Sequence, residues 1–334
     1  MTTPDASSTP TRRRWPVVLA VALVMLVGAE LAARAVMTQL PEPLVWPRYE
    51  VQRKVERMDV LGRSGCVDVA IFGSSVANAA IDAGQLSELS GQRVYNAGLG
   101  GSAPDAWPTW AAEVVIPAIC PREALIGVTL RDLNDIDVDA SFLDSYRRSI
   151  GRLDRVGELG GWAQAKKTAW DNSGLFALQR SFRRPADALA FASSGAGPWR
   201  VINDQYGTLT RFRNAGYDNS AARRNYDRNV VFAEYSPSAA RIEALIELAS
   251  TLDRNGASVS LVLLPFTDET VDYLDDGTDD VAAFVAAMTE LASREQLPLI
   301  DLLDVIDDRS VFADDYHPNG EGASLVTSAL HERR

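Results

Sequence analysis

The sequence predicts a three-layer α/β fold with a central parallel sheet, preceded by one membrane-spanning helix. Two observations predict it. From residue 67 onward, short apolar runs alternate with helical stretches, a pattern typical of parallel strands joined by helices. Near the N-terminus, three arginines (Arg12, Arg13 and Arg14) come directly before an apolar run from Trp15 to Ala29.

The N-terminal apolar segment, residues 15–38, is the candidate transmembrane anchor. Because the arginines precede it, the positive-inside rule keeps residues 1–14 in the cytoplasm and places the chain after about residue 40 outside. The uninterrupted run is shorter than the ~20 residues of a spanning helix, but Arg34 can extend it by snorkelling. A cleaved signal is the alternative, because Ala33-Arg34-Ala35 has the small-x-small form of a cleavage site. We expect a single-pass protein of a bacterial cell membrane with an extracytoplasmic domain.

The exported part is expected to form one domain. Residues 39–66 are expected to be a linker, because Pro41, Pro43 and Pro47 oppose a long helix. The domain itself covers residues 67–334, with a partly helical insertion at about 137–235 where no clean periodicity is visible. The predicted strands cover residues 67–72, 93–95, 124–129, 259–264 and 297–302, and the predicted helices about 82–89, 106–115, 237–255 and 279–294.

Composition narrows the possible partners. The net charge is −12, whereas nucleic-acid binding needs a basic surface, so no nucleic-acid partner is expected. The chain has two histidines and two cysteines, and none of the usual zinc or phosphate-binding motifs. We therefore expect no cofactor and no metal.

Polar residues follow three of the predicted strands. The first strand ends in Gly73-Ser74-Ser75, the second in the turn Asn96–Gly101, and the third in the segment Arg131–Asn134. Open α/β sheets bind ligands at the carboxyl ends of their strands. These three segments are therefore expected to meet at one edge of the sheet.

A serine nucleophile at this edge needs a base, and histidine is the usual one. His331 lies in the last four residues, where chains are often poorly ordered. His317 is therefore the candidate base. Asp314, three residues earlier, has the spacing to orient the imidazole ring, and Asp315 is the fallback.

In this order, Ile71-Phe-Gly-Ser-Ser75, Asn96-Ala-Gly-Leu-Gly-Gly101, Arg131–Asn134 and Asp314-Asp-Tyr-His317 resemble the four sequence blocks of the SGNH (GDSL-like) hydrolase family. The resemblance covers residues 67–136 and 237–330. It implies a flavodoxin-like three-layer fold, with Ser75 as nucleophile, His317 as base and Asp314 orienting the base. Ser74 stands where the family has an aspartate.

The resemblance also implies an oxyanion hole. The backbone N–H groups of Ser75 and Gly101 would be two of its donors. In the family an asparagine side chain is the third. Asn134 fills that position if the loop is two or three residues longer, and Arg131 takes it if the strand aligns without a gap.

An exported domain of this kind behind one N-terminal segment is similar to proteins that acylate cell-envelope polysaccharides. The resemblance implies a serine esterase or O-acyltransferase that acts on acylated envelope glycans or lipids. It also suggests a multi-span membrane O-acyltransferase as partner. The alternative is a catalytically silent scaffold or binding protein of an envelope assembly, against which the intact Ser75, Asp314 and His317 count.

The two cysteines predict a disulfide. Cys66 comes just before the first strand, and Cys120 just before the third. In flavodoxin-like sheets of order 2-1-3-4-5 these strands are parallel neighbours. Strand spacing of ~4.8 Å lies within the range a disulfide bridges, and the expected compartment is oxidising. Two buried, reduced cysteines are the alternative.

Overall fold

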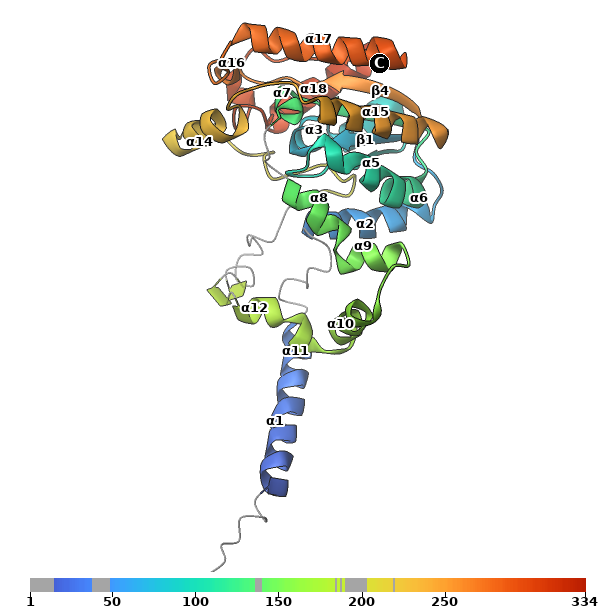
Figure 1. Cartoon of the computed structure of the whole chain (residues 1–334), viewed down its shortest axis with the longest axis vertical. Helices are drawn as coiled ribbons and strands as arrows, with labels where there is room; N and C mark the ends of the chain where they lie inside the picture. The colour runs from blue at the N-terminus through green and yellow to red at the C-terminus, as the bar shows by residue number, and fades with distance from the viewer. Residues whose placement is uncertain are drawn as a thin grey trace, which may run out of the picture. The chain divides into compact units, whose positions relative to one another are not determined.

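The computed structural model describes residues 15–37, 49–135, 140–183, 185–186, 188–189, 203–218 and 220–334 (Figure 1). The chain divides into two compact units. The larger unit comprises Trp46–Glu158 and Val201–Arg334, and the smaller one comprises Met1–Val45 and Leu159–Arg200. Each unit is described by itself.

A five-stranded parallel sheet forms the centre of the larger unit, in the order β2-β1-β3-β4-β5. In the register of its central pair, Val69 of β1 lies beside Glu123 of β3, and Gly73 beside Gly127. The central strands are apolar and buried, as expected of a parallel sheet covered on both faces. The predicted fold class is confirmed. The strands are β1 (Val69–Gly73), β2 (Val94–Asn96), β3 (Glu123–Val128), β4 (Ser258–Leu263) and β5 (Leu299–Asp301).

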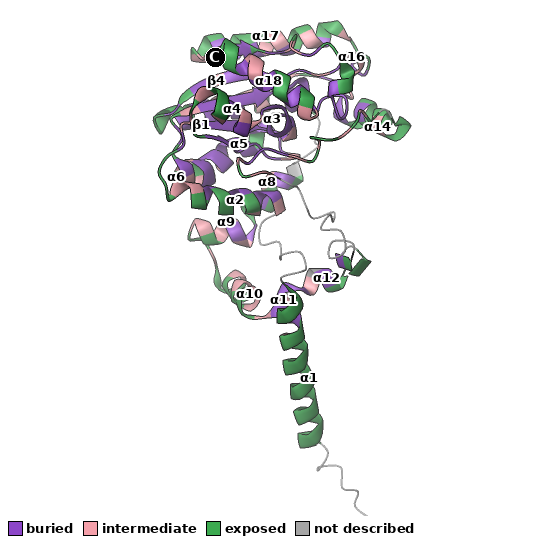
Figure 2. Ribbon diagram, turned by 180° about the vertical axis from the view of Figure 1, so that it is seen from behind, coloured by how far each residue is buried: buried purple, intermediate pink, exposed green. Residues whose placement is uncertain are grey.

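Helices cover the sheet in two groups. Helix α18 contacts α3 and α4, and α15 contacts α5 and α17. Right-handed crossovers place the connection after β1 on one face and those after β2, β3 and β4 on the other. In Figure 2 the buried layer between the helices is the sheet. The helices are α3 (Ser75–Ala80), α4 (Ala83–Ser90), α5 (Trp107–Trp110), α6 (Ile116–Ile119), α15 (Ala239–Arg254), α17 (Thr278–Glu295) and α18 (Gly320–Arg333).

Shorter helical segments complete the larger unit at the ends of the strands. A π-helical segment, η3 (Ala111–Val115), joins α5 to α6, and α7 (Leu130–Leu133) follows β3 directly. The remaining short segments are η2 (Pro104–Ala106), α16 (Asp268–Val271) and η5 (Arg309–Val311).

Helix α2 (Tyr49–Gly62) corrects the predicted linker over residues 39–66. The three prolines that argued against a helix all precede it, so none interrupts its hydrogen bonds. Its buried side chains include Val51, Val55 and Met58, which pack into the larger unit. The linker prediction is therefore wrong for residues 49–62, and residues 39–48 lie outside the described residues.

The predicted insertion at 137–235 is divided between the two units. Helices α8 (Ala140–Arg147), α9 (Ile150–Arg155) and α14 (Ala221–Tyr226) and the π-helical η4 (Asp227–Val231) belong to the larger unit. Arg152 of α9 holds Glu113 of η3 through two hydrogen bonds of 2.6 and 2.7 Å. Helices α10 (Gly161–Asn172), α11 (Gly174–Ala177) and α12 (Gln179–Arg183) belong instead to the smaller unit.

Helix α1 (Trp15–Val36) organises the smaller unit. Its 22 residues correspond to about 33 Å, enough to cross a ~30 Å hydrocarbon layer. Nearly all of its side chains are exposed (Figure 2). By length and composition it can span a membrane, and an N-terminal signal sequence has the same properties.

The two charged residues within α1 are both paired. Glu30 lies 2.7 Å from Arg34 and accepts hydrogen bonds from the backbone N–H groups of Gly174 (2.8 Å) and Leu175 (3.1 Å). Ser173 donates a further one, at 2.9 Å. The carboxylate that interrupts the apolar run therefore caps α11 and ties this short helix to α1.

The predicted disulfide between Cys66 and Cys120 is present, with a Cα–Cα distance of 4.9 Å. The strands that the two cysteines precede, β1 and β3, are neighbours in the sheet. Cys120 ends α6 with φ of 35° and so turns the chain toward β3. The bridge thus lies at the amino ends of the strands.

We predict that no thiol reacts when the protein is alkylated under denaturing conditions without reductant. After reduction two thiols per chain should react. Because the bridge closes a loop of 54 residues, a Cys66→Ala/Cys120→Ala variant should lose on the order of 4 kcal/mol of unfolding free energy, as measured by denaturant titration. Two reactive thiols without reductant would disprove the bridge.

Candidate active site

The nucleophile position is set by the turn from β1 into α3. Gly73 ends the strand with φ of 145°, and a Cβ there would lie 2.5 Å from the carbonyl oxygen of Gly127. Ser74 is the N-cap of α3 and accepts a hydrogen bond from the N–H of Val76 at 3.3 Å. Ser74 is fully buried, whereas Ser75, the first residue of the helix, is half-buried. The hydroxyl that reaches the surface is therefore that of Ser75.

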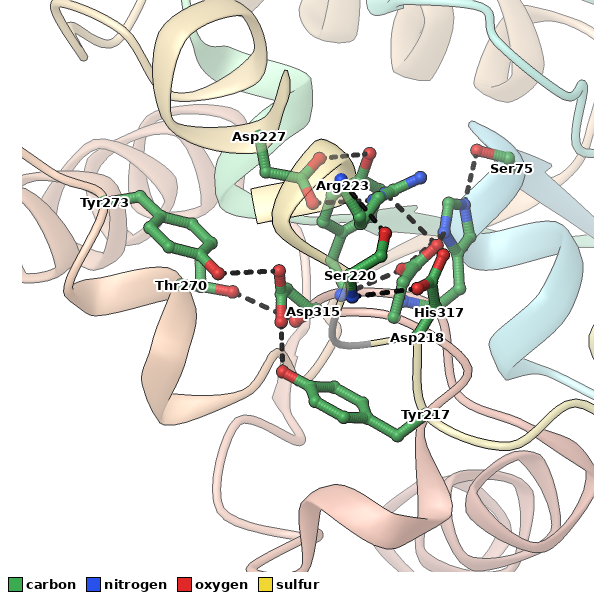
Figure 3. Close-up of polar contacts among 12 residues, drawn as sticks. Ser75, Tyr217, Asp218, Ser220, Arg223, Asp227, Thr270, Tyr273, Asp315 and His317 are labelled. Atoms are coloured by element: carbon green, nitrogen blue, oxygen red, sulfur yellow. Dashed lines mark hydrogen bonds and ion pairs between the residues drawn. The ribbon is translucent and has the colours of Figure 1, made fainter. Parts of the chain in front are cut away.

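Ser75, His317 and Asp314 form a continuous hydrogen-bonded chain. Figure 3 shows the link between Ser75 and His317. The Oγ of Ser75 lies 2.8 Å from Nε2 of His317. The Nδ1 of His317 lies 2.8 and 2.9 Å from the two carboxylate oxygens of Asp314. His317 and Asp314 are both buried. The three predicted catalytic residues thus have the geometry of a nucleophile, a base and the group that orients the base.

The turn that carries the histidine orients Asp314. Its Oδ1 accepts hydrogen bonds from the backbone N–H groups of Tyr316 (3.2 Å) and His317 (2.9 Å). Burial alone would raise the pKa of Asp314. The charge and hydrogen bond of His317, together with the charge of Arg223, outweigh burial and lower this pKa to about 2. The carboxylate is therefore ionised at neutral pH and favours the Nδ1–H form of the ring.

Arg223 lies behind Asp314 and was not predicted from the sequence. Its Nη2 is 3.1 Å from Oδ2 of Asp314, and its Nε donates to Oδ2 of Asp227 at 2.6 Å. The guanidinium carbon lies 5.0 Å from the centroid of the Tyr316 ring. Against the pull of Arg223, burial raises the pKa of Asp227 to about 7. Arg223 and Asp227 belong to the predicted insertion, where no periodicity or motif singled them out.

Asp315, the fallback orienting residue, points away from the histidine ring. Its two carboxylate oxygens accept hydrogen bonds from the hydroxyls of Tyr217 and Tyr273, the latter at 3.0 Å. Its backbone carbonyl accepts from the hydroxyl of Thr270 at 2.9 Å. Asp315 therefore fixes the turn that carries His317 and does not contact the ring. His331, expected to be poorly ordered, is an exposed residue of α18.

Two aromatic rings hold the imidazole in place. Phe212 stacks on His317 with a centroid distance of 4.4 Å and an interplanar angle of 25°. The Tyr316 ring lies 4.6 Å from the imidazole centroid. Phe212 comes from the segment before α14 and is half-buried. It restricts the ring to the orientation in which Nε2 faces Ser75.

The turn after β2 carries Gly101, the predicted backbone donor. Gly101 has φ of 64°, a conformation that favours glycine, and is half-buried. Asn96, at the start of the turn, is fully buried. Its amide donates to the carbonyls of Ala77 and Ile81 and accepts from the N–H of Gly98. Asn96 thus fixes the turn to α3.

Of the two candidate side-chain donors, Asn134 makes other contacts. The Asn134 amide donates to the carbonyls of Val231 (2.9 Å) and Ala233 (3.4 Å), and its oxygen accepts from the N–H of Ser236 (3.2 Å). Asn134 is thus committed to holding the chain after η4, which corrects its assignment to the oxyanion hole. Nη1 of Arg131, on α7, lies 3.4 Å from Oδ1 of Asp132. The charge of Arg131 opposes the increase that burial causes in the pKa of Tyr316, the neighbour of His317.

No protein-family model matches this sequence, and neither does any curated protein. Among solved structures, the chain is similar to an acylhydrolase of Bacteroides fragilis. The sequence identity is 12%, the match covers 84% of this chain and 93% of that chain, and the TM-score is 0.40. A GDSL-like lipase of Bacteroides thetaiotaomicron has 10% identity, coverages of 79% and 86%, and a TM-score of 0.37. An acetyl xylan esterase has 14% identity, coverages of 79% and 98%, and a TM-score of 0.40.

We predict that Asp314 contributes pH-dependent stability. Its folded-state pKa of about 2 lies below the usual 3.8. The contribution, about 2 kcal/mol, is therefore present above pH ~4 and is lost as the pH falls toward 2. Urea titrations should show that the gap in unfolding free energy between wild type and Asp314→Asn narrows over this range. A gap that stays constant would contradict the prediction, and the exposed control Asp253→Asn should differ little from wild type at either pH.

Proposed function

We propose that this chain is a serine esterase or O-acyltransferase that works through an acyl-enzyme at Ser75. One observation carries the proposal: the hydrogen-bonded chain from Ser75 through His317 to Asp314, with distances of 2.8 Å at each link. The hydrogen bond between Ser75 and His317 joins residues that are 242 positions apart in the sequence. A scaffold without catalytic activity has no need of this alignment.

In the proposed reaction, Oγ of Ser75 attacks the carbonyl carbon of an ester while Nε2 of His317 takes the hydroxyl proton. The tetrahedral intermediate collapses when His317 returns that proton to the leaving alcohol, leaving an acyl-enzyme. Water or a sugar hydroxyl then gives its proton to His317 and attacks the acyl carbon. His317 passes this proton to Oγ of Ser75 as the bond between Oγ and the acyl carbon breaks, which frees Ser75 and releases the acid or the new ester. Asp314 stabilises the imidazolium formed in each half.

The oxyanion would be held by backbone N–H groups of Ser75 and Gly101. The N–H of Ser75 lies in the first turn of α3, where helix N–H groups have no partner within the helix. We assign Arg131 as the side-chain donor in place of Asn134, whose amide is committed to Val231 and Ala233. Such donors are worth ~3 kcal/mol each at the transition state.

We further propose that the substrates are acylated glycans or lipids of a bacterial cell envelope. Helix α1 would anchor the chain in the cell membrane with residues 1–14 in the cytoplasm, and a multi-span membrane O-acyltransferase would be the partner that supplies acyl groups. The three arginines before α1 and the disulfide support export. Product analysis with an oligosaccharide acceptor distinguishes transfer from hydrolysis.

We predict that a fluorophosphonate probe labels the full-length protein and that Ser75→Ala abolishes the labelling. The reason is that Ser75 alone among the described serines has its hydroxyl 2.8 Å from a histidine nitrogen. In-gel fluorescence and peptide mass spectrometry give the measurement. Labelling of Ser75→Ala at another serine would contradict the assignment.

The matched control is Ser74→Ala. It removes the side-chain cap of α3 and should cost about 1 kcal/mol of stability. It should keep the labelling, because the Ser74 side chain faces the helix N-terminus and lies buried. Loss of labelling in a folded Ser74→Ala protein would indicate that Ser74, and not Ser75, is the nucleophile.

For topology, we predict that a reporter fused after residue 40 is active only outside the cytoplasm, because the arginines precede the apolar run. Phosphatase and fluorescent-protein fusions provide complementary readouts. A reporter active inside the cell would overturn export. A mature N-terminus near Val36, found by mass spectrometry, would replace the anchor with a cleaved signal.

A further inference from the structure

Two charged side chains of α2, Glu50 and Lys54, are buried beside the proposed oxyanion hole, each only 1% exposed. They lie on one face of the helix, four residues apart. Buried charges are uncommon unless they are paired and hydrogen-bonded. Neither residue has a part in the proton transfers proposed above, and both precede the sequence blocks in which the candidate site was found.

The Glu50 carboxylate joins the two elements that carry the backbone donors. Its Oε2 accepts from the N–H of Gly100 at 2.8 Å, and its Oε1 accepts from the amide of Asn78 at 2.5 Å. Gly100 directly precedes Gly101. Asn78 belongs to α3, three residues after Ser75. One carboxylate thus ties the turn after β2 to the helix that begins with the nucleophile.

The close approach of Glu50 explains the glycine at position 100. A Cβ on Gly100 would lie 2.6 Å from Oε2 of Glu50, so any other residue there would push the carboxylate out of this position. The planar peptide unit that follows Gly100 carries the N–H of Gly101, so holding Gly100 at Glu50 also restricts where the N–H of Gly101 points. The two adjacent glycines therefore have separate roles. Gly100 binds Glu50, and Gly101 is the proposed oxyanion donor.

Lys54 balances the charge and extends the same connection. Its Nζ donates to the carbonyls of Asn96 and Gly207 at 2.6 Å each, and to Oδ1 of Asn78 at 3.2 Å. Burial lowers the pKa of Lys54 to about 8, and the charge of Glu50 opposes that decrease. The ammonium group thus fixes the start of the turn whose end Glu50 holds.

We propose that Glu50 is a positioning residue for the oxyanion hole, holding Gly100 so that the N–H groups of Gly101 and Ser75 face one point. This inference rests on the proposed function. It gives α2, which lies outside the resembling sequence blocks, an influence on transition-state stabilisation that acts through Gly100. A purely structural role would lower the stability of the protein and leave the turnover of the folded molecules unchanged.

The test compares Glu50→Gln with Glu56→Gln in the full-length protein, using 4-nitrophenyl acetate as substrate. The glutamine retains the shape of Glu50, but its NH₂ group cannot accept from Gly100 or Asn78. Glu56 is the matched control, because it makes the same charge change on the same helix at a side chain that is 46% exposed. We expect kcat of Glu50→Gln to fall about 10- to 100-fold, with KM within about threefold of wild type.

Glu50→Asp provides the second variant. It keeps the buried charge but draws the carboxylate back from Gly100, so kcat should fall less than in Glu50→Gln. Thermal melting by circular dichroism reports folding in each case. A folded Glu50→Gln protein with wild-type kcat would overturn the inference. So would failure of both variants to fold, which would assign Glu50 to the fold alone.

The wild-type protein separates this inference from the proposed function. If the fluorophosphonate probe does not label Ser75 and the ester is not hydrolysed, the proposed function fails and the positioning role fails with it. If Ser75 is labelled and the wild-type protein hydrolyses the ester, a wild-type kcat in Glu50→Gln would refute only the positioning role of Glu50.

Discussion

The whole arrangement depends on the parallel direction of β1, β2 and β3. Their carboxyl ends meet at one edge of the sheet, so the segments after them converge although they are far apart in the chain. Ser75 follows β1, the Asn96–Gly101 turn follows β2, and α7 follows β3. The disulfide uses the other end of the same strands. It joins β1 to β3 before they begin, where it does not restrict the substrate side.

Each polar group at the site is held by a second set of residues. Asp314 is held by two backbone N–H groups and by Arg223, and His317 by two aromatic rings. Preorganised dipoles and charges lower a reaction barrier only if they need not reorganise during the reaction. Much of this support comes from outside the sheet, from α2 and from the segments around α14. These segments outside the sheet thus position the site residues in addition to connecting the strands.

The sheet, the disulfide and the three residues of the hydrogen-bonded chain could be predicted from short motifs and from the strand order that they imply. Apolar runs mark buried strands, and Asp314 lies one turn before His317. The contacts of Arg223, Phe212 and Glu50 were not predictable, since they depend on where irregular segments fold back. Asn134 shows the same limit. Its place in the sequence suited an oxyanion donor, but the chain after η4 competes for its amide. The prolines before α2 oppose a helix only where they stand, so they do not bear on residues 49–62.

The disulfide loop has a consequence for how the protein is made. Residues 66–120 contain both Ser75 and Gly101, so the nucleophile and its neighbouring N–H donor lie in a part of the chain that can close covalently early. His317, the proposed base, comes 242 residues after Ser75, the proposed nucleophile. At a synthesis rate of about 5–20 residues per second, that interval is on the order of tens of seconds. During it the emerging chain carries Ser75 without its partner histidine, so under the proposed mechanism reactivity toward esters would begin only after His317 has been added.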